Sequence, residues 1–219
     1  LQALISLGEP NDVVRLIRLG LHDADSAVRA GVSRWLARQA TGAPRPGTED
    51  DWRAIQPAWD KLLGDDDPDV RFESARGLLA LSTDHDAARE ILLEFLRDPE
   101  TQPAMQVSIL KTLSHLGARL PAEAGPWRQL LQSDQAEVRE EAAKAVGICV
   151  LASTSDLASP LFVLLNDEEP LVREEAARAL GRSPVASAEI LTALEAAVQD
   201  DDSLVAETAQ SSLAALRSR

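Results

Sequence analysis

The sequence predicts an all-α fold, a solenoid of stacked helix–turn–helix repeats. An apolar residue recurs every 33 to 42 positions, and small or apolar residues follow it four and eight positions later, which is the spacing of one helix face. A two-helix unit is too thin to bury this face alone, so neighbouring units must stack. The recurring residues, counted below as position 0 of each repeat, are Val28, Val70, Met105, Val138, Val172 and Val205.

Each position 0 is preceded by signals that start a helix. An aspartate three residues earlier can cap free backbone N–H groups, and proline two residues earlier suits a first helical turn. Glycine after the apolar stripe predicts a C-terminal stop. The aspartates are Asp25, Asp67 and Asp202, the prolines are Pro68, Pro103 and Pro170, and the glycines are Gly147 and Gly181.

A second apolar-periodic stretch precedes each of these helices. It lies near 11–21, 49–63, 86–97, 122–132, 156–165 and 186–199. We therefore expect a single repeat domain over 1–219, with a half-repeat at 1–8 and repeats at approximately 9–40, 41–82, 83–117, 118–152, 153–183 and 184–219. The chain starts at Leu1, and the apolar stripe Leu1, Leu4 and Leu7 predicts further repeats before it. Polar Ser211 and Ser212 suit a C-terminal cap.

Composition excludes several classes of protein. The 219 residues carry a formal net charge of −14, with a pI of about 4.6, and contain one cysteine. A single cysteine rules out an internal disulfide framework, and no apolar run is long enough to span a bilayer. Such acidity argues against general binding to nucleic acid or to anionic membranes. No secretory signal is visible, so the cytoplasm is the default location.

The residues that carry most enzyme chemistry are scattered. His22, His85 and His115 belong to three different repeats and Cys149 stands alone, so we expect no metal site and no cofactor. Cys149 follows Gly147 within the apolar stretch Ile148 to Leu151, and is expected to be a buried small side chain. The runs 65–67 and 200–202 are three aspartates each, and helix capping explains them better than calcium binding. No catalytic constellation is visible, so we expect no enzyme.

The long first interval contains a Pro/Gly-rich loop, 41–47, and then an aromatic stripe. Thr48 and Asp51 have the spacing of a capping box, with Asp in place of the usual Glu. The residues Trp52, Ile55, Trp59 and Leu62 follow at helical spacing, with Pro57 as a possible kink. Core packing is the favoured interpretation of this stripe, and a partner-binding feature is the alternative.

Residues 167–181, Asp-Glu-Glu-Pro-Leu-Val-Arg-Glu-Glu-Ala-Ala-Arg-Ala-Leu-Gly, resemble the short HEAT-like repeat of the phycobilin lyases. Residues 136–147 are similar, whereas the third and sixth repeats depart from the pattern. The resemblance implies a right-handed α-solenoid whose second helices line the concave side. It also implies a structural ladder, in which the acidic turn caps a helix and the arginine bridges turns. Members of this family are protein-binding scaffolds, chromophore lyase subunits or, in one basic branch, DNA glycosylases.

Position +6 of the second helices is basic in five of six repeats, at Arg34, Arg76, Lys111, Lys144 and Arg178. We refer to these five residues as the cation column. Positions +2, +3 and +6 are expected to point away from the apolar stripe. In the fourth and fifth repeats, Glu140–Lys144 and Glu174–Arg178 are i,i+4 pairs. In the first three repeats no Glu lies four residues earlier, and the neighbours Ala30, Phe72 and Val107 are apolar. Unpaired cations beside an exposed aromatic residue predict a recognition surface.

The function predicted from sequence is a non-enzymatic protein-binding scaffold that uses the concave face. The partner would be another protein, with an acidic segment as one candidate, and its contacts would be Arg34, Phe72, Arg76, Val107, Lys111, Lys144 and Arg178. A plain solvated face remains the structural alternative. Two further alternatives are a lyase of the phycobilin-lyase type, with the cations facing an anionic tetrapyrrole, and a HEAT-like nucleic-acid binder. The oligomeric state stays open.

Overall fold

The computed structural model describes residues 10–41, 48–82, 85–117, 124–150 and 157–219. Every regular element among these residues is helical. The half-repeat expected at 1–8 and most of the 41–47 loop lie outside the described residues. By its internal packing the chain divides into two units, 1–95 and 96–219. The division into repeats over one domain stays a prediction.

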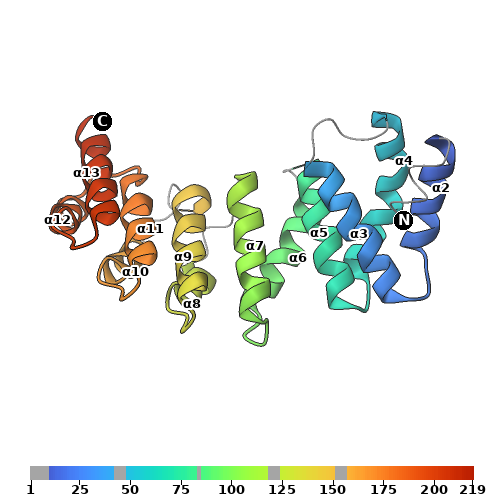
Figure 1. Ribbon diagram of the computed structural model, residues 1–219, viewed down its shortest axis with the longest axis horizontal. Helices are drawn as coiled ribbons and strands as arrows, with labels where there is room; N and C mark the ends of the chain where they lie inside the picture. The colour runs from blue at the N-terminus through green and yellow to red at the C-terminus, as the bar shows by residue number, and fades with distance from the viewer. Residues whose placement is uncertain (1–9, 42–47, 83–84, 118–123, 151–156) are drawn as a thin grey trace. The chain divides into compact units, whose positions relative to one another are not determined.

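The first unit contains two packed helix pairs and most of a further helix. The helices are α2 (Pro10–Leu21), α3 (Ser26–Thr41), α4 (Glu49–Asp60), the 3-10 turn η1 (Lys61–Gly64), α5 (Pro68–Leu81) and α6 (Asp86–Arg97). The second helices α3 and α5 pack against each other, and α2 and α4 lie behind them (Figure 1). The aromatic stripe of α4 is core, as predicted: Trp52, Ile55, Trp59 and Leu62 are buried.

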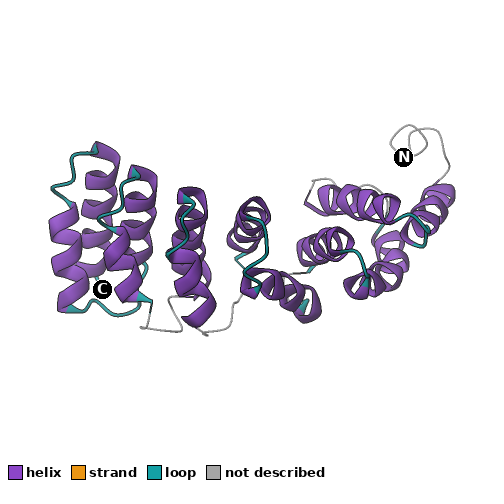
Figure 2. Ribbon diagram, turned by 90° about the horizontal axis from the view of Figure 1, so that it is seen from below, coloured by secondary structure: helices purple, strands orange, loops and turns teal. Residues whose placement is uncertain are grey.

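The second unit repeats this arrangement in two layers. Its helices are α7 (Pro103–Leu116), α8 (Ala124–Leu131), α9 (Ala136–Ala145), the π-helical turn η2 (Val146–Val150), α10 (Ala158–Leu164), α11 (Pro170–Gly181), α12 (Ala188–Ala197) and α13 (Ser203–Arg217). Helices α7, α9, α11 and α13 form one row, and α8, α10 and α12 pack behind it (Figure 2). The predicted first helices and second helices are therefore confirmed in the described residues, and no helix there is long and apolar enough to cross a membrane.

Helix starts follow the sequence signals. Asp67 and Asp202 are N-cap residues whose side chains accept backbone N–H groups, and the Asp25 carboxylate accepts the amide of Ala27. Thr48 and Asp51 form the predicted capping box. The three prolines stand in the first turns of α5, α7 and α11. These caps satisfy N–H groups that have no partner inside the helix.

The core lies where successive second helices meet. The residues at positions 0, +4 and +8 are buried in α5, α9 and α11, among them Val70, Val138 and Val172. At position 0, Val28 is 39% exposed and Met105 is half-buried. Alanines at +4 and +5 of α9 and α11 are fully buried, and their small size lets the helix backbones approach closely.

The prediction that glycine ends the helix is confirmed at Gly181 and wrong at Gly147, and neither residue is a left-handed C-cap. Among the described residues a positive φ occurs at Gly117 only, which is the left-handed C-cap of α7. Gly147 continues into the π-helical turn, and Gly181 is the last residue of α11. Both are glycine because of a neighbouring helix. A Cβ at Gly147 would lie 2.8 Å from the Ala179 Cα, and one at Gly181 would lie 2.5 Å from the Ser212 Cβ.

Two glycines in the first unit offer a matched test of this packing. A Cβ at Gly77 of α5 would lie 2.2 Å from a ring carbon of the buried Trp59, whereas one at Gly31 of α3 would meet nothing within 4 Å. We expect Gly77→Ala to lower the free energy of unfolding by about 1–3 kcal/mol through overpacking. Gly31→Ala should raise it by about 0.5–1 kcal/mol, since Gly is a poor helix residue. Urea unfolding followed by circular dichroism measures both, and equal effects would contradict the packing argument.

Candidate functional site

Two sets of charged residues run along the second helices. One set lies at the turns that open these helices and contains an arginine at position +1 and an aspartate at position −5. The other is the cation column at position +6, together with glutamates at position +3. The structure gives partners to both sets, and those partners decide which side chains remain available to a ligand.

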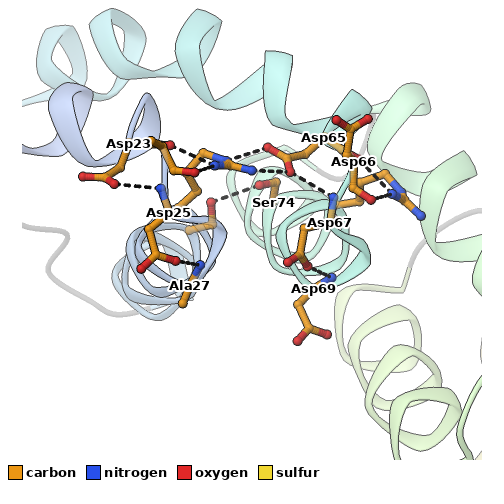
Figure 3. Close-up of polar contacts among 12 residues, drawn as sticks. Asp23, Asp25, Ala27, Asp65, Asp66, Asp67, Asp69 and Ser74 are labelled. Carbon is orange, nitrogen blue, oxygen red and sulfur yellow. Dashed lines mark hydrogen bonds and ion pairs between the residues drawn. The ribbon is translucent and has the colours of Figure 1, made fainter.

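Arginines at position +1 join one turn to the next. The Arg29 guanidinium donates through Nε and Nη2 to both carboxylate oxygens of Asp65, at 2.7 Å each, and through Nη1 to the Asp23 carbonyl oxygen at 2.8 Å (Figure 3). The same two-pronged contact links Arg139 to Asp167 and Arg173 to Asp200, at 2.8 Å. We call these three contacts the arginine forks. Planar guanidinium and carboxylate groups match in this geometry, which makes the hydrogen bonds strong and directional.

Each aspartate of a fork also shapes its own turn. The Asp65 carboxylate accepts the amide of Asp67, and the Asp200 carboxylate accepts the amide of Asp202 (Figure 3 shows the first). A neighbouring contact in the same view joins the buried hydroxyls of Ser33 and Ser74 at 3.0 Å, between α3 and α5. The predicted structural ladder is therefore confirmed: the acidic runs cap helices, and the arginines bridge turns.

The forks set the pKa values of their carboxylates. Hydrogen bonds from Arg29 hold the pKa of Asp65 below its ordinary value, and those from Arg173 do the same for Asp200. Burial alone would raise the pKa of Asp167, but hydrogen bonds from Arg139 and from the Glu169 amide outweigh burial and lower it. These aspartates are therefore ionised partners of fixed cations, and the forks leave them no role as acid–base catalysts.

Arg71 has a different partner. Its Nη1 donates to the Asp65 carbonyl oxygen at 2.7 Å, as the other arginines do within their own turns. Its guanidinium carbon lies 5.7 Å from the centroid of the Phe95 ring, a cation–π contact. Phe95 in turn meets Phe72 edge to face, with ring centroids 6.4 Å apart.

The face of the second helices differs from the sequence prediction. Ala30, Phe72 and Val107 were expected to be exposed, yet their exposed fractions are 6–8%. Position +3 is buried as well where it is glutamate: Glu73, Glu141 and Glu175 are 4–8% exposed. The physical reason is that a second helix packs against second helices of its unit as well as against the first-helix layer, so more than one stripe is covered. The prediction that Phe72 is exposed is thus wrong.

The cations of the column are paired, contrary to the expectation for the first three repeats. Arg34 Nε donates to Glu73 Oε1 of α5 at 2.6 Å, and Arg76 donates to the other oxygen of the same carboxylate at 2.5 Å. Lys111 Nζ lies 2.9 Å from Glu137 and 3.9 Å from Glu141. The buried carboxylate of Glu73 thus binds one cation from its own helix, Arg76, and one from the preceding second helix, Arg34.

The two predicted i,i+4 pairs have different outcomes. Arg178 forms the predicted ion pair with Glu174, and a second one with Glu175. Lys144 forms its ion pair with Glu141 at 3.7 Å, three residues away, instead of with Glu140. Burial raises the pKa of Glu140, which the adjacent Glu141 raises further, and burial also raises the pKa of Glu175.

A simple rule therefore accounts for the column. A cation stands at +6 wherever the same repeat or the next one has a glutamate at +3. The sixth repeat, which has Thr208 at +3, has Ser211 at +6. The sequence signal for these ion pairs is the pairing of +3 with +6 across adjacent repeats, which the i,i+4 spacing within one helix does not contain. The cations remain partly accessible, since their side chains are 26–51% exposed.

Cys149 and His85, whose residue types can carry enzyme chemistry, make ordinary structural contacts. Cys149 lies in the π-helical turn, where its Sγ donates to the Leu113 carbonyl oxygen at 3.5 Å, and burial raises the pKa of its thiol to about 11. A thiol with so high a pKa carries almost no thiolate at neutral pH. His85 Nε2 lies 3.0 Å from the Asp60 carboxylate. Among the described residues, no group of three histidine, cysteine or acidic side chains is arranged to hold a metal ion.

Comparison with known proteins agrees with this repeat geometry. Residues 124–214 match the family described as HEAT repeats. The matched segment includes two of the three forks and the three buried glutamates of the second unit, Glu141, Glu174 and Glu175. A search among curated proteins gave no match.

Solved structures that resemble the chain are helical repeat proteins. An engineered protein is 23% identical, with a TM-score of 0.61, over 94% of this chain and 99% of that one. A designed armadillo repeat protein in complex with the peptide (KR)4 is 21% identical, with a TM-score of 0.59, over 92% and 98%. A HEAT-like repeats protein from the archaeon Thermococcus onnurineus is 14% identical, with a TM-score of 0.58, over 95% and 88%. At these identities the similarity shows the fold, an α-solenoid of helical repeats.

The forks yield a prediction about stability. Arg173→Ala should lower the free energy of unfolding by about 1.5–3 kcal/mol, because the mostly buried Asp200 would lose a charged hydrogen-bond partner. Arg217→Ala is the matched control, since Arg217 pairs with Glu195 where both side chains are at least half exposed. Its loss should cost under about 1 kcal/mol. Urea denaturation of both variants tests this, and equal midpoints would show that the forks do not stabilise the fold.

The pKa shifts predict a stability maximum at mildly acidic pH. The fork aspartates have folded pKa values below the unfolded value of about 3.9, so their stabilisation is complete above that pH and is lost as the pH falls through the folded values. Glu140 and Glu175 have raised folded pKa values, so the folded state gains stability as the pH drops from 7 towards them. Urea unfolding between pH 7 and pH 3 should show a rise and then a fall. In Glu175→Gln the rise should be smaller, and an unchanged profile would contradict the assignment.

Proposed function

We propose that this chain is a non-enzymatic protein-binding module that receives an acidic segment of another protein on the face of its second helices. The contacts would be the cation column: Arg34, Arg76, Lys111, Lys144 and Arg178. Phe72 and Val107 support this face from below as buried side chains and do not anchor the partner.

The observation that carries the proposal is the partial exposure of these cations above buried carboxylates. Arg34 uses Nε for Glu73, and its side chain remains 47% exposed. A guanidinium has five N–H donors, so donors remain for a partner's carboxylate. The glutamates below are held at 5–11% side-chain exposure, so a partner meets the cations first. The designed armadillo protein in the comparison shows that a solenoid of this fold can hold a charged peptide.

The mechanism of recognition would be charge matching along repeated helices. Each exposed cation contributes little by itself because solvent screens it, whereas the two cations of the first unit, or the three of the second, can bind successive groups of an extended segment. The chain's net charge of −14 opposes acidic partners at long range. Affinity should therefore depend on local contacts with the column and increase as salt screens the overall repulsion, up to the point where the contacts themselves weaken.

A test must remove cations without leaving a buried charge alone. Reversing Arg34 and Arg76 would strand the Glu73 carboxylate and unfold the first unit. The informative variant is therefore Arg34→Ala/Arg76→Ala in a Glu73→Gln background, with Glu73→Gln alone as the matched control. Lys111→Ala/Lys144→Ala in a Glu141→Gln background is the equivalent in the second unit.

The probe is a random dodecapeptide library displayed on phage and selected on the wild-type chain. We expect acidic peptides to be enriched and, in fluorescence anisotropy, to bind at least tenfold more weakly to one of the cation-depleted variants than to its control. Circular dichroism checks that each variant is folded. If no peptide is enriched, or if neither variant weakens binding, the proposal is wrong.

A further inference from the structure

A groove of about 420 Å³ runs between α11 and α13 in the second unit. The helices lie in parallel register, since the Thr208 hydroxyl at +3 of α13 reaches Glu174 at +2 of α11, and Gly181 of α11 packs against Ser212 of α13. The groove is lined along α13 from Leu204 to Ala215. At a rise of 1.5 Å per helical residue this spans roughly 16 Å, which about five extended residues cover at ~3.3 Å each.

Charge is unevenly placed along this groove. Arg178 and Arg182 of α11 line the end near the helix C-termini, whereas Leu204 and Glu207 of α13 line the opposite end. Arg178 is already neutralised by Glu174 and Glu175. Arg182 is exposed, and among the described residues no hydrogen bond or direct ion pair holds its guanidinium. Its charge acts on the Glu175 carboxyl, and its Nη1 would lie 3.6 Å from a Cβ at Gly147. It lies outside the pairing rule of the column, because it stands at position +10.

The sixth repeat departs from the pairing pattern beside this groove. Where the fifth repeat has Glu175 and Arg178, the sixth has Thr208 and Ser211, which are uncharged and short. The exposed Ser211 hydroxyl stands at the same position of α13 as Arg178 does in α11, and offers a hydrogen-bond donor without a competing charge. The sixth repeat therefore adds no carboxylate at +3 to this groove, and the carboxylates beside Arg178 are those of Glu174 and Glu175 of α11.

The other end of the groove presents an apolar side chain. Leu204 stands at position −1 of α13 and is 49% exposed beside the carboxylate of Glu207. An exposed leucine in a groove is typical of a contact for an aliphatic side chain. The Glu207 carboxylate disfavours an acidic group at this end, so charge fixes which end of the groove takes which group.

We propose that the α11–α13 groove binds an extended segment of a partner protein that carries an acidic residue, held by Arg182 with Arg178 and Ser211, and an aliphatic residue roughly three to five positions away, held by Leu204. The spacing follows from the separation of Leu204 from Arg178 and Arg182 along parallel helices. This inference rests on the proposed function and names the sequence pattern that one part of the surface selects.

The chain supplies matched controls for both contacts. Leu171 stands at the same −1 position of α11, is 54% exposed and does not line the groove, so Leu171→Ser controls Leu204→Ser. Arg217→Ala controls the charge lost in Arg182→Ala, because Arg217 lies on α13 and pairs with Glu195 outside the groove. All four residues are exposed, so these variants should fold like the wild type.

The experiment uses dodecapeptides selected from the phage library on the whole chain and measures their affinities by fluorescence anisotropy. We expect a class of peptides with Asp or Glu three to five residues from Leu, Ile or Val, which binds at least tenfold more weakly to Arg182→Ala and at least fivefold more weakly to Leu204→Ser. Arg217→Ala and Leu171→Ser should change affinity less than twofold.

The outcomes separate this inference from the proposed function. Peptides that lose affinity in the cation-depleted variants but not in Arg182→Ala or Leu204→Ser would overturn the groove assignment and leave the proposed function standing. Peptides sensitive to Arg182 and Leu204 alone would support the groove and refute the column. Enrichment of basic peptides, or of none, would overturn both.

Discussion

The close contact between successive second helices is the constraint on which the rest of the structure depends. Alanines at +4 and +5 and glycines such as Gly181 allow this approach, and a single added Cβ at Gly181 would collide with the next helix. Because each helix is covered by neighbours of its own layer, positions that would be wet on an isolated amphipathic helix become buried. Glu73 and Glu141 are among them, and a buried carboxylate requires a cation.

That requirement explains most of the charged residues on the second helices. Arg34 and Arg76 both serve one buried carboxylate, and the forks use the position +1 arginines at the turns in the same cross-repeat manner. The strongly acidic chain therefore holds much of its positive charge in contacts that set the register of one helix on the next. The partial exposure of the column follows from length: a long side chain reaches a buried partner while part of it stays in water.

Much of this could be predicted from the sequence, and the rest could not, for a definite reason. Local spacing in the sequence predicts the helix positions, the Thr48 capping box, the buried stripe that contains Trp59 and the Asp…Val-Arg ladder. The structure confirms all four. The exposure of Phe72 and the free state of Arg34 were inferred wrongly, because both depend on residues about 25 to 40 positions away in the chain. Comparing +3 with +6 across adjacent repeats would have revealed the ion pairs, since Glu and cation occur together there.

This pairing rule also indicates where to look for recognition in a repeat protein. A cation that is paired with a buried glutamate cannot leave it for a ligand without leaving that carboxylate buried and unpaired. Ligand binding at the cation column must therefore use only the N–H donors that these ion pairs leave free. A cation outside the rule bears no such cost. Arg182 is a side chain of this kind, and it lies beside a repeat whose Thr208 and Ser211 have replaced both members of the usual pair. A guanidinium that acts on Glu175 without a direct ion pair, as that of Arg182 does, can turn towards a partner's carboxylate without leaving a buried one unpaired.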